Sequence, residues 1–324
     1  MAIELSLGHS PDPDDAFMWW PLGTAGLEGG PAGAPVLDPA LDLGGYRFRP
    51  VAADIQALNE RAIERGDLDI TAMSMHAYGL VRDRYVLTDC GASFGEGYGP
   101  KLVVRDGASG GAGGGLDWVL EVLGGGGRVA VPGYETTGYL VLRLMLGASG
   151  EEIANRPLGE GFVAMRFDEI VPALLRGEVD AGLVIHEAQV TYASEGLGLV
   201  VDLGAWWAEE TGGLPLPLGA NAVRADLDAR FGDGTTVEVS RLLSASVEHA
   251  VANRGSGLEY AERFAVAGGA GGAGSKAVDE FVGMYVNELT RSMGERGRRA
   301  VVELIGRGEA AGLIPPSDAG VRVV

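Results

Sequence analysis

Residues 66–76 read GDLDITAMSMH, and residues 177–187 read GEVDAGLVIHE. In both stretches a helical pattern ends at a glycine, an acid–apolar–Asp step follows, and a short apolar run ends in polar side chains. The two stretches align with an offset of 111 residues, which pairs Gly66 with Gly177 and Asp69 with Asp180. Glycine suits a helix end because it adopts positive φ without strain. The doubled pattern therefore predicts two α/β lobes of like construction.

Apolar periodicity supports this interpretation on both sides of each glycine. Segments 54–66 and 167–177 each place apolar residues on one helical face, and short strands are expected over 70–73 and 181–185. In open α/β sheets, ligands bind beyond the carboxyl ends of the strands. Ser74 and His76 after the first strand, and His186 and Glu187 after the second, are therefore expected to face a shared cleft.

The imidazole of His186 is the sharpest candidate for chemistry, because it can take or give a proton near neutral pH. The competing interpretation is a partly buried, hydrogen-bonded histidine with a structural role. His186-Glu187 does not begin an H-E-x-x-H metal motif, because position 190 is Val190. No metal site is expected in this chain.

A strand over Ile3–Leu7 precedes the segment HSPDPDD at residues 9–15. Asp12 suits a helix N-cap and Pro13 the first helical position. His9 and Ser10 either line the cleft or belong to the start of this helix. The carboxylates that follow Pro13 would repel an anion, so no anion is placed there.

A third strand is expected over Arg128–Val131, with a helix from Thr136 to Leu146. The hydroxyl groups of Thr136 and Thr137 and the free backbone amides of a helix start favour an anion such as a carboxylate. Ordinary capping is the alternative role for both threonines.

Glycine and proline mark two extended crossings between the lobes, at residues 95–100 and 214–219. The crossings predict one discontinuous lobe of residues 1–103 plus 218–324 and a second lobe of residues 104–217. Helices are expected over 238–251, 275–293 and 296–305. Three glycine-rich runs, at 107–115, 124–127 and 268–274, lack the Lys-Ser/Thr pair of a phosphate loop and are interpreted as surface turns.

Composition limits the classes of partner. The chain has 324 residues, with 25 Lys and Arg against 45 Asp and Glu, for a formal net charge of −20. Nucleic acid and anionic membrane surfaces are not expected as partners, because both require a basic face. The single cysteine, Cys90, indicates a buried apolar residue in a reduced compartment. Without a signal-peptide pattern at its start, the chain is expected to be cytoplasmic.

An ordered set of motifs resembles the menaquinone-biosynthesis enzymes of the futalosine route, above all the 1,4-dihydroxy-6-naphthoate synthases. The matching stretches are HSPDPDDAFM (9–18), DITAMSMHAY (69–78), GEGYGP (95–100), PG with TT (132–137), IHE (185–187), LGAWW (203–207) and LPLPLG (214–219). They cover about the first 225 residues in order.

The resemblance implies a two-lobed fold like that of type II periplasmic binding proteins, with a central ligand cleft. It implies a lyase that converts cyclic dehypoxanthinyl futalosine, an aromatic carboxylate, to 1,4-dihydroxy-6-naphthoate with release of a three-carbon fragment. No metal or organic cofactor is expected. The histidine that matches His186 is the family's catalytic base, and residues that match Ser74 and Thr136 or Thr137 line its ligand site.

Two other functions remain open. One is the chorismate dehydratase of the same pathway, and the other is a non-catalytic solute-binding protein of the same fold. The motifs at 185–187 and 206–207 favour the naphthoate synthase.

Overall fold

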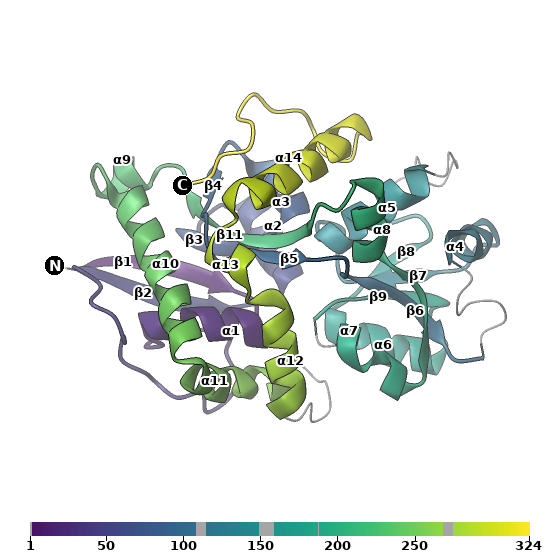
Figure 1. Ribbon diagram of the computed structural model, residues 1–324, viewed down its shortest axis with the longest axis horizontal. Coiled ribbons are helices and arrows are strands. Elements are labelled where there is room, and N and C mark those ends of the chain that lie inside the picture. Colours follow the sequence, from purple (N-terminus) through teal and green to yellow (C-terminus); the bar gives the residue numbers. More distant parts are fainter. Residues whose placement is uncertain (1, 108–114, 149–158, 187, 268–274) are drawn as a thin grey trace.

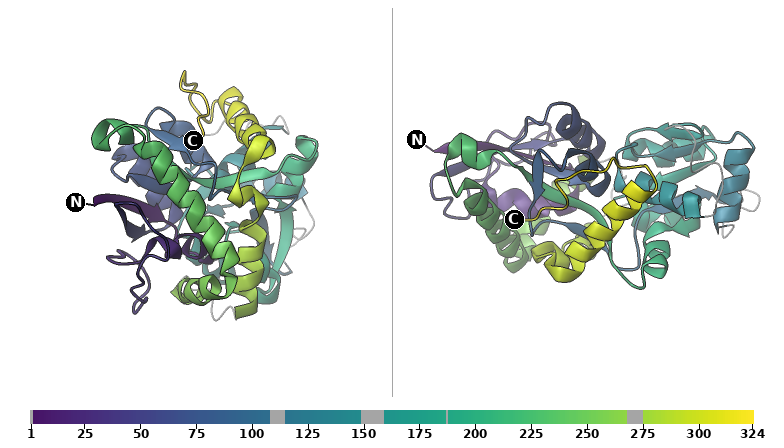
Figure 2. Two further views of the ribbon diagram at one scale, coloured as in Figure 1. Left: turned by 60° about the vertical axis from the view of Figure 1, so that its left-hand side comes forward. Right: turned by 90° about the horizontal axis from the view of Figure 1, so that it is seen from above.

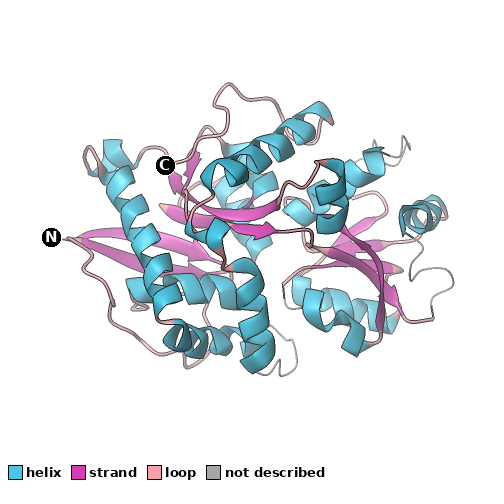
Figure 3. Cartoon of the chain, in the orientation of Figure 1, coloured by secondary structure: helices cyan, strands magenta, loops and turns pink. Residues whose placement is uncertain are grey.

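The computed structural model describes residues 2–107, 115–148, 159–186, 188–267 and 275–324. Two lobes lie side by side along the long axis of the molecule (Figure 1), and each contains its own β-sheet (Figure 3). Seen from above, the two lobes again lie side by side (Figure 2). The predicted α/β class and two-lobed architecture are confirmed.

The first sheet has the order β2-β1-β3-β11-β4, and β5 also pairs with β11. Strands β1, β2 and β3 run parallel, whereas β11 is antiparallel to β3. The strands are β1 (Ile3–His9), β2 (Tyr46–Ala52), β3 (Ile70–Ser74), β4 (Tyr85–Leu87), β5 (Ser93–Gly95) and β11 (Leu216–Arg224).

The second sheet has the order β10-β6-β9-β7-β8. Its part β8-β7-β9-β6 repeats the arrangement β2-β1-β3-β11, with three parallel strands and an antiparallel neighbour. This repetition is the structural counterpart of the doubled sequence pattern. The strands are β6 (Lys101–Arg105), β7 (Val129–Val131), β8 (Phe162–Ala164), β9 (Ala181–Val184) and β10 (Leu197–Asp202).

The chain passes between the sheets twice, between Gly95 and Lys101 and between Asp202 and Leu216. Both passages coincide with the glycine- and proline-rich segments. The predicted boundaries at 103/104 and 217/218 fall inside β6 and β11, because these strands begin directly at the ends of the crossings. The division into two domains at those residue numbers stays a prediction.

Helices cover both faces of the first sheet. One side carries α1 packed on α10, α11 and α12, and the other side carries α2 and α3 (Figure 1). The helices are α1 (Pro13–Trp19), α2 (Ile55–Glu64), α3 (Met75–Val81), α9 (Leu227–Phe231), α10 (Thr235–Ala252), α11 (Arg254–Ala267), α12 (Ser275–Tyr285), α13 (Glu288–Arg291) and α14 (Gly294–Ala310), with a 3₁₀ turn over Trp20–Leu22.

The single helix predicted over 275–293 is wrong. The chain breaks after Tyr285, because the side chain of Asn287 accepts from the backbone N–H of Leu289 and caps the new helix α13. Helix α11 was not predicted. Both differences lie in the C-terminal third of the chain.

The second lobe carries α4 (Gly115–Gly124), α5 (Thr137–Ala148), α6 (Phe167–Arg176), α7 (Ala188–Thr191) and α8 (Leu203–Glu210), with a 3₁₀ turn over Tyr192–Glu195. Gly177 ends α6 at φ 72° and Gly66 follows α2 at φ 58°, as the doubled pattern predicted. Residues 108–114 and 268–274 of two glycine-rich runs lie outside the described residues. In the described ranges, no helix is long and apolar enough to span a bilayer.

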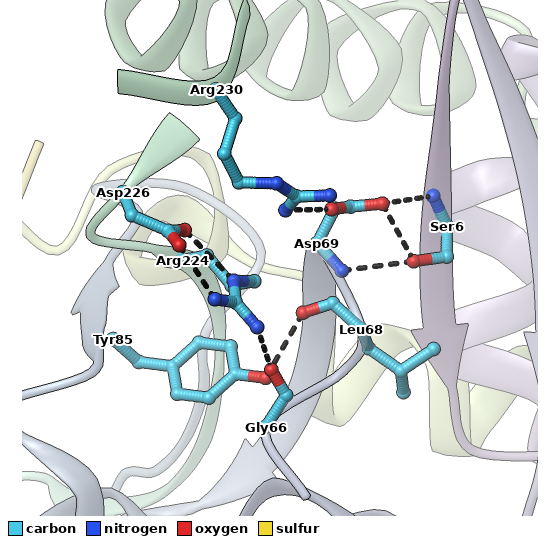
Figure 4. Close-up of polar contacts among 8 residues, drawn as sticks. All are labelled: Ser6, Gly66, Leu68, Asp69, Tyr85, Arg224, Asp226 and Arg230. Carbon is cyan, nitrogen blue, oxygen red and sulfur yellow. Dashed lines mark hydrogen bonds and ion pairs between the residues drawn. The ribbon is translucent and has the colours of Figure 1, made fainter. Parts of the chain in front are cut away.

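The aspartates of the doubled pattern, Asp69 and Asp180, lie just before β3 and β9, and each connects its strand to a neighbouring one. Figure 4 shows the contacts of Asp69. Asp69 accepts hydrogen bonds from the backbone N–H (2.9 Å) and hydroxyl (2.8 Å) of Ser6 on β1, and it pairs with Arg230. Asp180 accepts from the backbone N–H of Arg128 (2.8 Å) before β7. Each aspartate thus ties its strand to the parallel neighbour, so these two acids are structural.

Cys90 is buried, and burial raises the pKa of its thiol to about 12. A thiol that stays protonated is a poor nucleophile. The prediction of a small buried apolar residue is confirmed.

Candidate active site

A cavity of about 120 Å³ lies where the two lobes meet. Both lobes and the crossing at Pro100 contribute to its wall. Polar groups come from the ends of β1, β3 and β9, from the start of β5, from the N-termini of α1 and α5, and from α7 and α12: Ser10, Asp12, Asp14, Asp15, Ser74, Ser93, Thr136, Thr137, His186, Gln189 and Tyr285. The carboxyl ends of β3 and β9 thus face one site, as predicted.

His186 lies two residues after Val184, the last residue of β9, and its imidazole contacts the first lobe. Its Nδ1 lies 3.1 Å from Oδ2 of Asp12, and its ring packs edge-on against Phe167 at 4.5 Å between centroids. Its φ is 54°, the only positive φ at a non-glycine residue in the described ranges. Such a conformation is uncommon for a side-chain-bearing residue and persists only where neighbours hold it. The ion pair and the ring contact supply that support.

Asp12 joins the start of α1 to His186. Its Oδ1 accepts from the backbone N–H of Asp15 (3.3 Å), so the predicted N-cap is confirmed. Burial acts to raise the pKa of Asp12, but the hydrogen bond and charge of His186 outweigh it and lower that pKa below its usual value. Asp12 is therefore a buried carboxylate that faces the imidazole.

Two further carboxyl groups, those of Asp14 and Asp15, line the same wall, and each is less than a tenth exposed. Burial raises the pKa of both well above the usual value, and the negative charge of Asp12 acts in the same direction. Asp15 accepts from the backbone N–H of Ser10 (2.7 Å). Sequence reasoning treated these residues as charges of the first helical turn and missed their place in the cavity.

Ser74 ends β3 in the cavity wall. Its Oγ accepts from the side-chain amide of Asn59 (3.0 Å), and its backbone N–H donates to the same side chain (2.9 Å). The hydroxyl proton therefore remains available to a ligand. Asn59 is fully buried on α2 and was not predicted, because one amide on a helical face carries no distinctive sequence signal.

The hydroxyl groups of the two threonines at the start of α5 form hydrogen bonds within the protein. The hydroxyl of Thr136 donates to the carbonyl of Gly133 (2.7 Å), and that of Thr137 donates to the carbonyl of Leu218 and accepts from Met75 N–H (2.8 Å). In the described part of the chain, no hydrogen bond leaves the backbone N–H of Thr137 or Gly138. The helix start therefore offers amides, rather than hydroxyl protons, to the cavity.

His9 and His76 do not line the cavity, so the structure corrects their predicted place. Nδ1 of His9 lies 2.8 Å from the carbonyl of Ser10, and its ring contacts Phe264. Nε2 of His76 lies 3.3 Å from the carbonyl of Leu313. Burial lowers the pKa of both histidines. His9 still belongs to β1, and His76 already belongs to the first turn of α3, which carries it away from the strand end.

One part of the cavity wall includes α12, which lies in the C-terminal third of the chain. The hydroxyl of Tyr285 on α12 and the side-chain amide of Gln189 on α7 are hydrogen bonded at 2.8 Å, and both residues line the cavity. Burial raises the pKa of Tyr285 above its usual value. Neither residue was predicted, because only tertiary packing brings α12 to the cleft. Glu187, expected from the sequence to face the cleft beside His186, lies outside the described residues.

A sequence model for menaquinone biosynthesis matches residues 5–310, almost the whole chain. The chain belongs to this family. It is 38% identical over 315 residues to a Thermus thermophilus protein named 1,4-dihydroxy-6-naphtoate synthase, with 97% of each chain covered. A Streptomyces coelicolor protein of the same name is 35% identical over 314 residues, which is 97% of this chain and 96% of the relative.

Solved structures place this menaquinone-biosynthesis family member in a wider fold group. An Archaeoglobus fulgidus protein matches with a TM-score of 0.74 and 35% identity, covering 96% of this chain and 98% of that one. A Candida albicans protein described as having the generic periplasmic binding protein fold matches with a TM-score of 0.64, 9% identity and coverage of 98% and 96%. The predicted periplasmic-binding-protein-like fold is confirmed.

The carboxyl and imidazole groups of the described part of this site are not arranged as a metal site. Within the described ranges, no three His, Cys, Asp or Glu side chains are arranged to hold a metal ion. The cavity wall instead contains the carboxyl groups of Asp12, Asp14 and Asp15 together with the imidazole of His186.

Proposed function

We propose that this protein is a carbon–carbon lyase that converts cyclic dehypoxanthinyl futalosine to 1,4-dihydroxy-6-naphthoate, with His186 as the general base. The observation that carries the proposal is the contact between His186 Nδ1 and Asp12 Oδ2 at the wall of the cavity between the lobes. Membership of the menaquinone biosynthesis family and the names of the two relatives support the choice of reaction.

The imidazole–carboxylate pair specifies the form of the base. When Nδ1–H donates to the Asp12 carboxylate, Nε2 is the ring nitrogen that accepts a proton. Nε2 takes the proton of a substrate hydroxyl, that carbon becomes a carbonyl, and the adjacent carbon–carbon bond breaks. The electron pair passes into the bicyclic ring system, which becomes aromatic. These steps leave the overall oxidation state unchanged, so we assign no cofactor.

The substrate carboxylate is placed at the N-terminus of α5. Thr137 and Gly138 line the cavity there, and the positive end of the helix dipole favours an anion. Ser74 also lines the cavity, and the side-chain amide of Asn59 donates to its hydroxyl oxygen. The hydroxyl of Ser74 donates to a substrate oxygen. Because the net charge is −20, this local arrangement rather than the overall field has to hold the anion.

The test is incubation of the purified protein with cyclic dehypoxanthinyl futalosine, followed by chromatography for the naphthoate. The wild-type protein is expected to form product, and His186→Ala is expected to lose about 10²–10⁴ in kcat, the usual worth of a general base. A His186→Ala protein that works at the parental rate would remove His186 from this role.

The same assay separates the two other functions. Consumption of chorismate in place of the futalosine derivative would support the dehydratase. Binding of the futalosine derivative without product would support a solute-binding protein. We place the enzyme in the cytoplasm, as expected for the biosynthetic function proposed.

A further inference from the structure

We propose that Asp14 enters the reaction as a protonated carboxyl group and delivers its proton to the substrate oxygen that becomes an aromatic hydroxyl. The proposal rests on the lyase function above and adds the general acid that the reaction requires. It also assigns Asp12 the return of the proton from His186 to Asp14.

The surroundings of Asp14 favour a neutral carboxyl group. Asp14 is 7% exposed, and within the described ranges no group donates a hydrogen bond to its buried Oδ1. Its Oδ2 receives a long contact of 3.4 Å from the Ser93 hydroxyl. A buried carboxylate with one oxygen unpaired and one long donor contact is costly, so the group holds its proton instead.

Asp15 provides the contrast on the same helical turn. It accepts a hydrogen bond of 2.7 Å from the backbone N–H of Ser10, which stabilises negative charge, whereas Asp14 has no equivalent donor. Asp14 is therefore the carboxyl group of this wall that is best placed to carry a proton.

Asp12 lies between the acid and the base. Its carboxylate faces Nδ1 of His186 at 3.1 Å and is hydrogen bonded to the carboxyl group of Asp14. A carboxylate that touches an imidazolium on one side and a carboxylic acid on the other can pass a proton between them. The titratable groups that face Asp14 are Asp12 and Asp15 on its own element, His186 beyond Asp12, and the hydroxyl of Tyr285 on α12.

The proton transfers of the reaction balance with no net reactant beyond the substrate. His186 Nε2 takes the hydroxyl proton of the substrate, and the broken carbon–carbon bond sends its electron pair into the ring. The ring oxygen takes the proton of Asp14, which yields the aromatic hydroxyl and leaves Asp14 ionised. After product release, the Nδ1 proton of His186 passes through Asp12 to Asp14. Exchange with water then moves the remaining imidazole proton from Nε2 to Nδ1, which restores the starting state.

The first arm of the test needs no turnover. Infrared difference spectra of Asp14→Asn against wild type, near neutral pH, are expected to show the loss of one carbonyl band of a protonated carboxylic acid. Asp38→Asn, the same change at an exposed position, is expected to lose no such band. A difference spectrum of Asp14→Asn without a lost acid band would overturn the proposal.

The second arm measures the reaction. Asp14→Asn is expected to lower kcat by about 10²–10⁴ with little change in KM, because the amide keeps the shape of the side chain but supplies no proton. The alkaline limb of the wild-type kcat–pH profile should disappear in this variant, and Asp14→Glu should recover part of the rate. A merely structural role would change stability and KM without removing that limb.

These outcomes distinguish the acid role of Asp14 from the lyase function of the protein. Normal turnover in wild type together with an unchanged kcat in Asp14→Asn would overturn the acid role alone. A wild type that shows the acid band but forms no naphthoate would overturn the lyase function, and with it the acid role.

Discussion

Asp12 combines a local and a distant role through its two carboxylate oxygens. Oδ1 caps α1, and Oδ2 faces His186 from the other lobe. The cap depends on an acceptor atom, whereas the contact with the imidazole depends on charge. A neutral side chain of the same shape separates the two roles.

Asp12→Asn is expected to keep the fold, because asparagine is an equally good N-cap. It is expected to lower kcat by about 10²-fold or more, since the amide neither stabilises an imidazolium nor holds one tautomer. Steady-state kinetics and thermal unfolding measure the two effects. Asp42→Asn, at an exposed acid that accepts from Gly44 N–H, is the control and should leave both unchanged. Wild-type kcat in Asp12→Asn would contradict the positioning role.

Asp14 also makes stability depend on pH. Its pKa is raised in the folded protein, so folding binds a proton that the unfolded chain releases above 3.8. The stabilisation is therefore fully present below that value and is lost as pH rises through the folded pKa. Urea unfolding at a series of pH values should show a smaller decline for Asp14→Asn than for wild type. Identical slopes would show that Asp14 is ionised in the folded protein.

At the scale of elements, glycine decides where a helix start meets a lobe crossing. Asp202 caps α8 by accepting from the backbone N–H of Gly204 (2.9 Å). A Cβ built on Gly204 would lie 2.0 Å from the carbonyl carbon and oxygen of Tyr98. The neighbouring atoms are backbone and cannot turn away, so the start of α8 and the first crossing pack only through glycine.

Gly204→Ala is expected to destabilise the protein by about 1–3 kcal/mol, the usual cost of overpacking. The control is Gly306→Ala inside α14, where a Cβ would meet nothing within 4 Å. This change should stabilise by about 0.5–1 kcal/mol, because alanine is the better helix former. Chemical unfolding of both variants measures the difference. Equal stabilities would refute the close approach at Gly204.

At the scale of the whole molecule, polar contacts hold the lobes together around the cavity. Thr137 on α5 of the second lobe donates to Leu218 on β11 and accepts from Met75 on α3, both in the first lobe. The carbonyl of Glu135, before α5, accepts from the side chain of Asn59 (3.4 Å). The hydroxyl of Thr137 thus connects the second lobe to two elements of the first.

Thr137→Val removes that hydroxyl at nearly constant volume and leaves two buried partners unsatisfied. It is expected to cost about 1–3 kcal/mol of unfolding free energy, with a more open molecule in small-angle scattering. Thr137→Ser keeps the hydroxyl and is expected to retain the compact scattering profile. A valine variant as stable and compact as the serine variant would show that the contact does not hold the lobes.

Local signals in the sequence were enough to predict much of this architecture. The doubled stretches at 66–76 and 177–187 led to two sheets with the same strand arrangement, and the N-cap at Asp12 is where proline and acidic residues indicated. His186 and Ser74 line the cavity because the end of a strand is a local feature, and the topology of open sheets places such ends at the ligand site.

The sequence by itself thus determined the fold class, the repeated element order and which residues end the strands, because caps, periodicity and glycine conformation act within a few residues. Only the tertiary structure decided which side chains meet: Asp12 with His186, Asp14 with Ser93, and Gln189 with Tyr285 from the last third of the chain. It also turned His9 and His76 away from the cavity. These contacts arise where two lobes pack, and neither periodicity nor local conformation carries information about which distant surfaces come together.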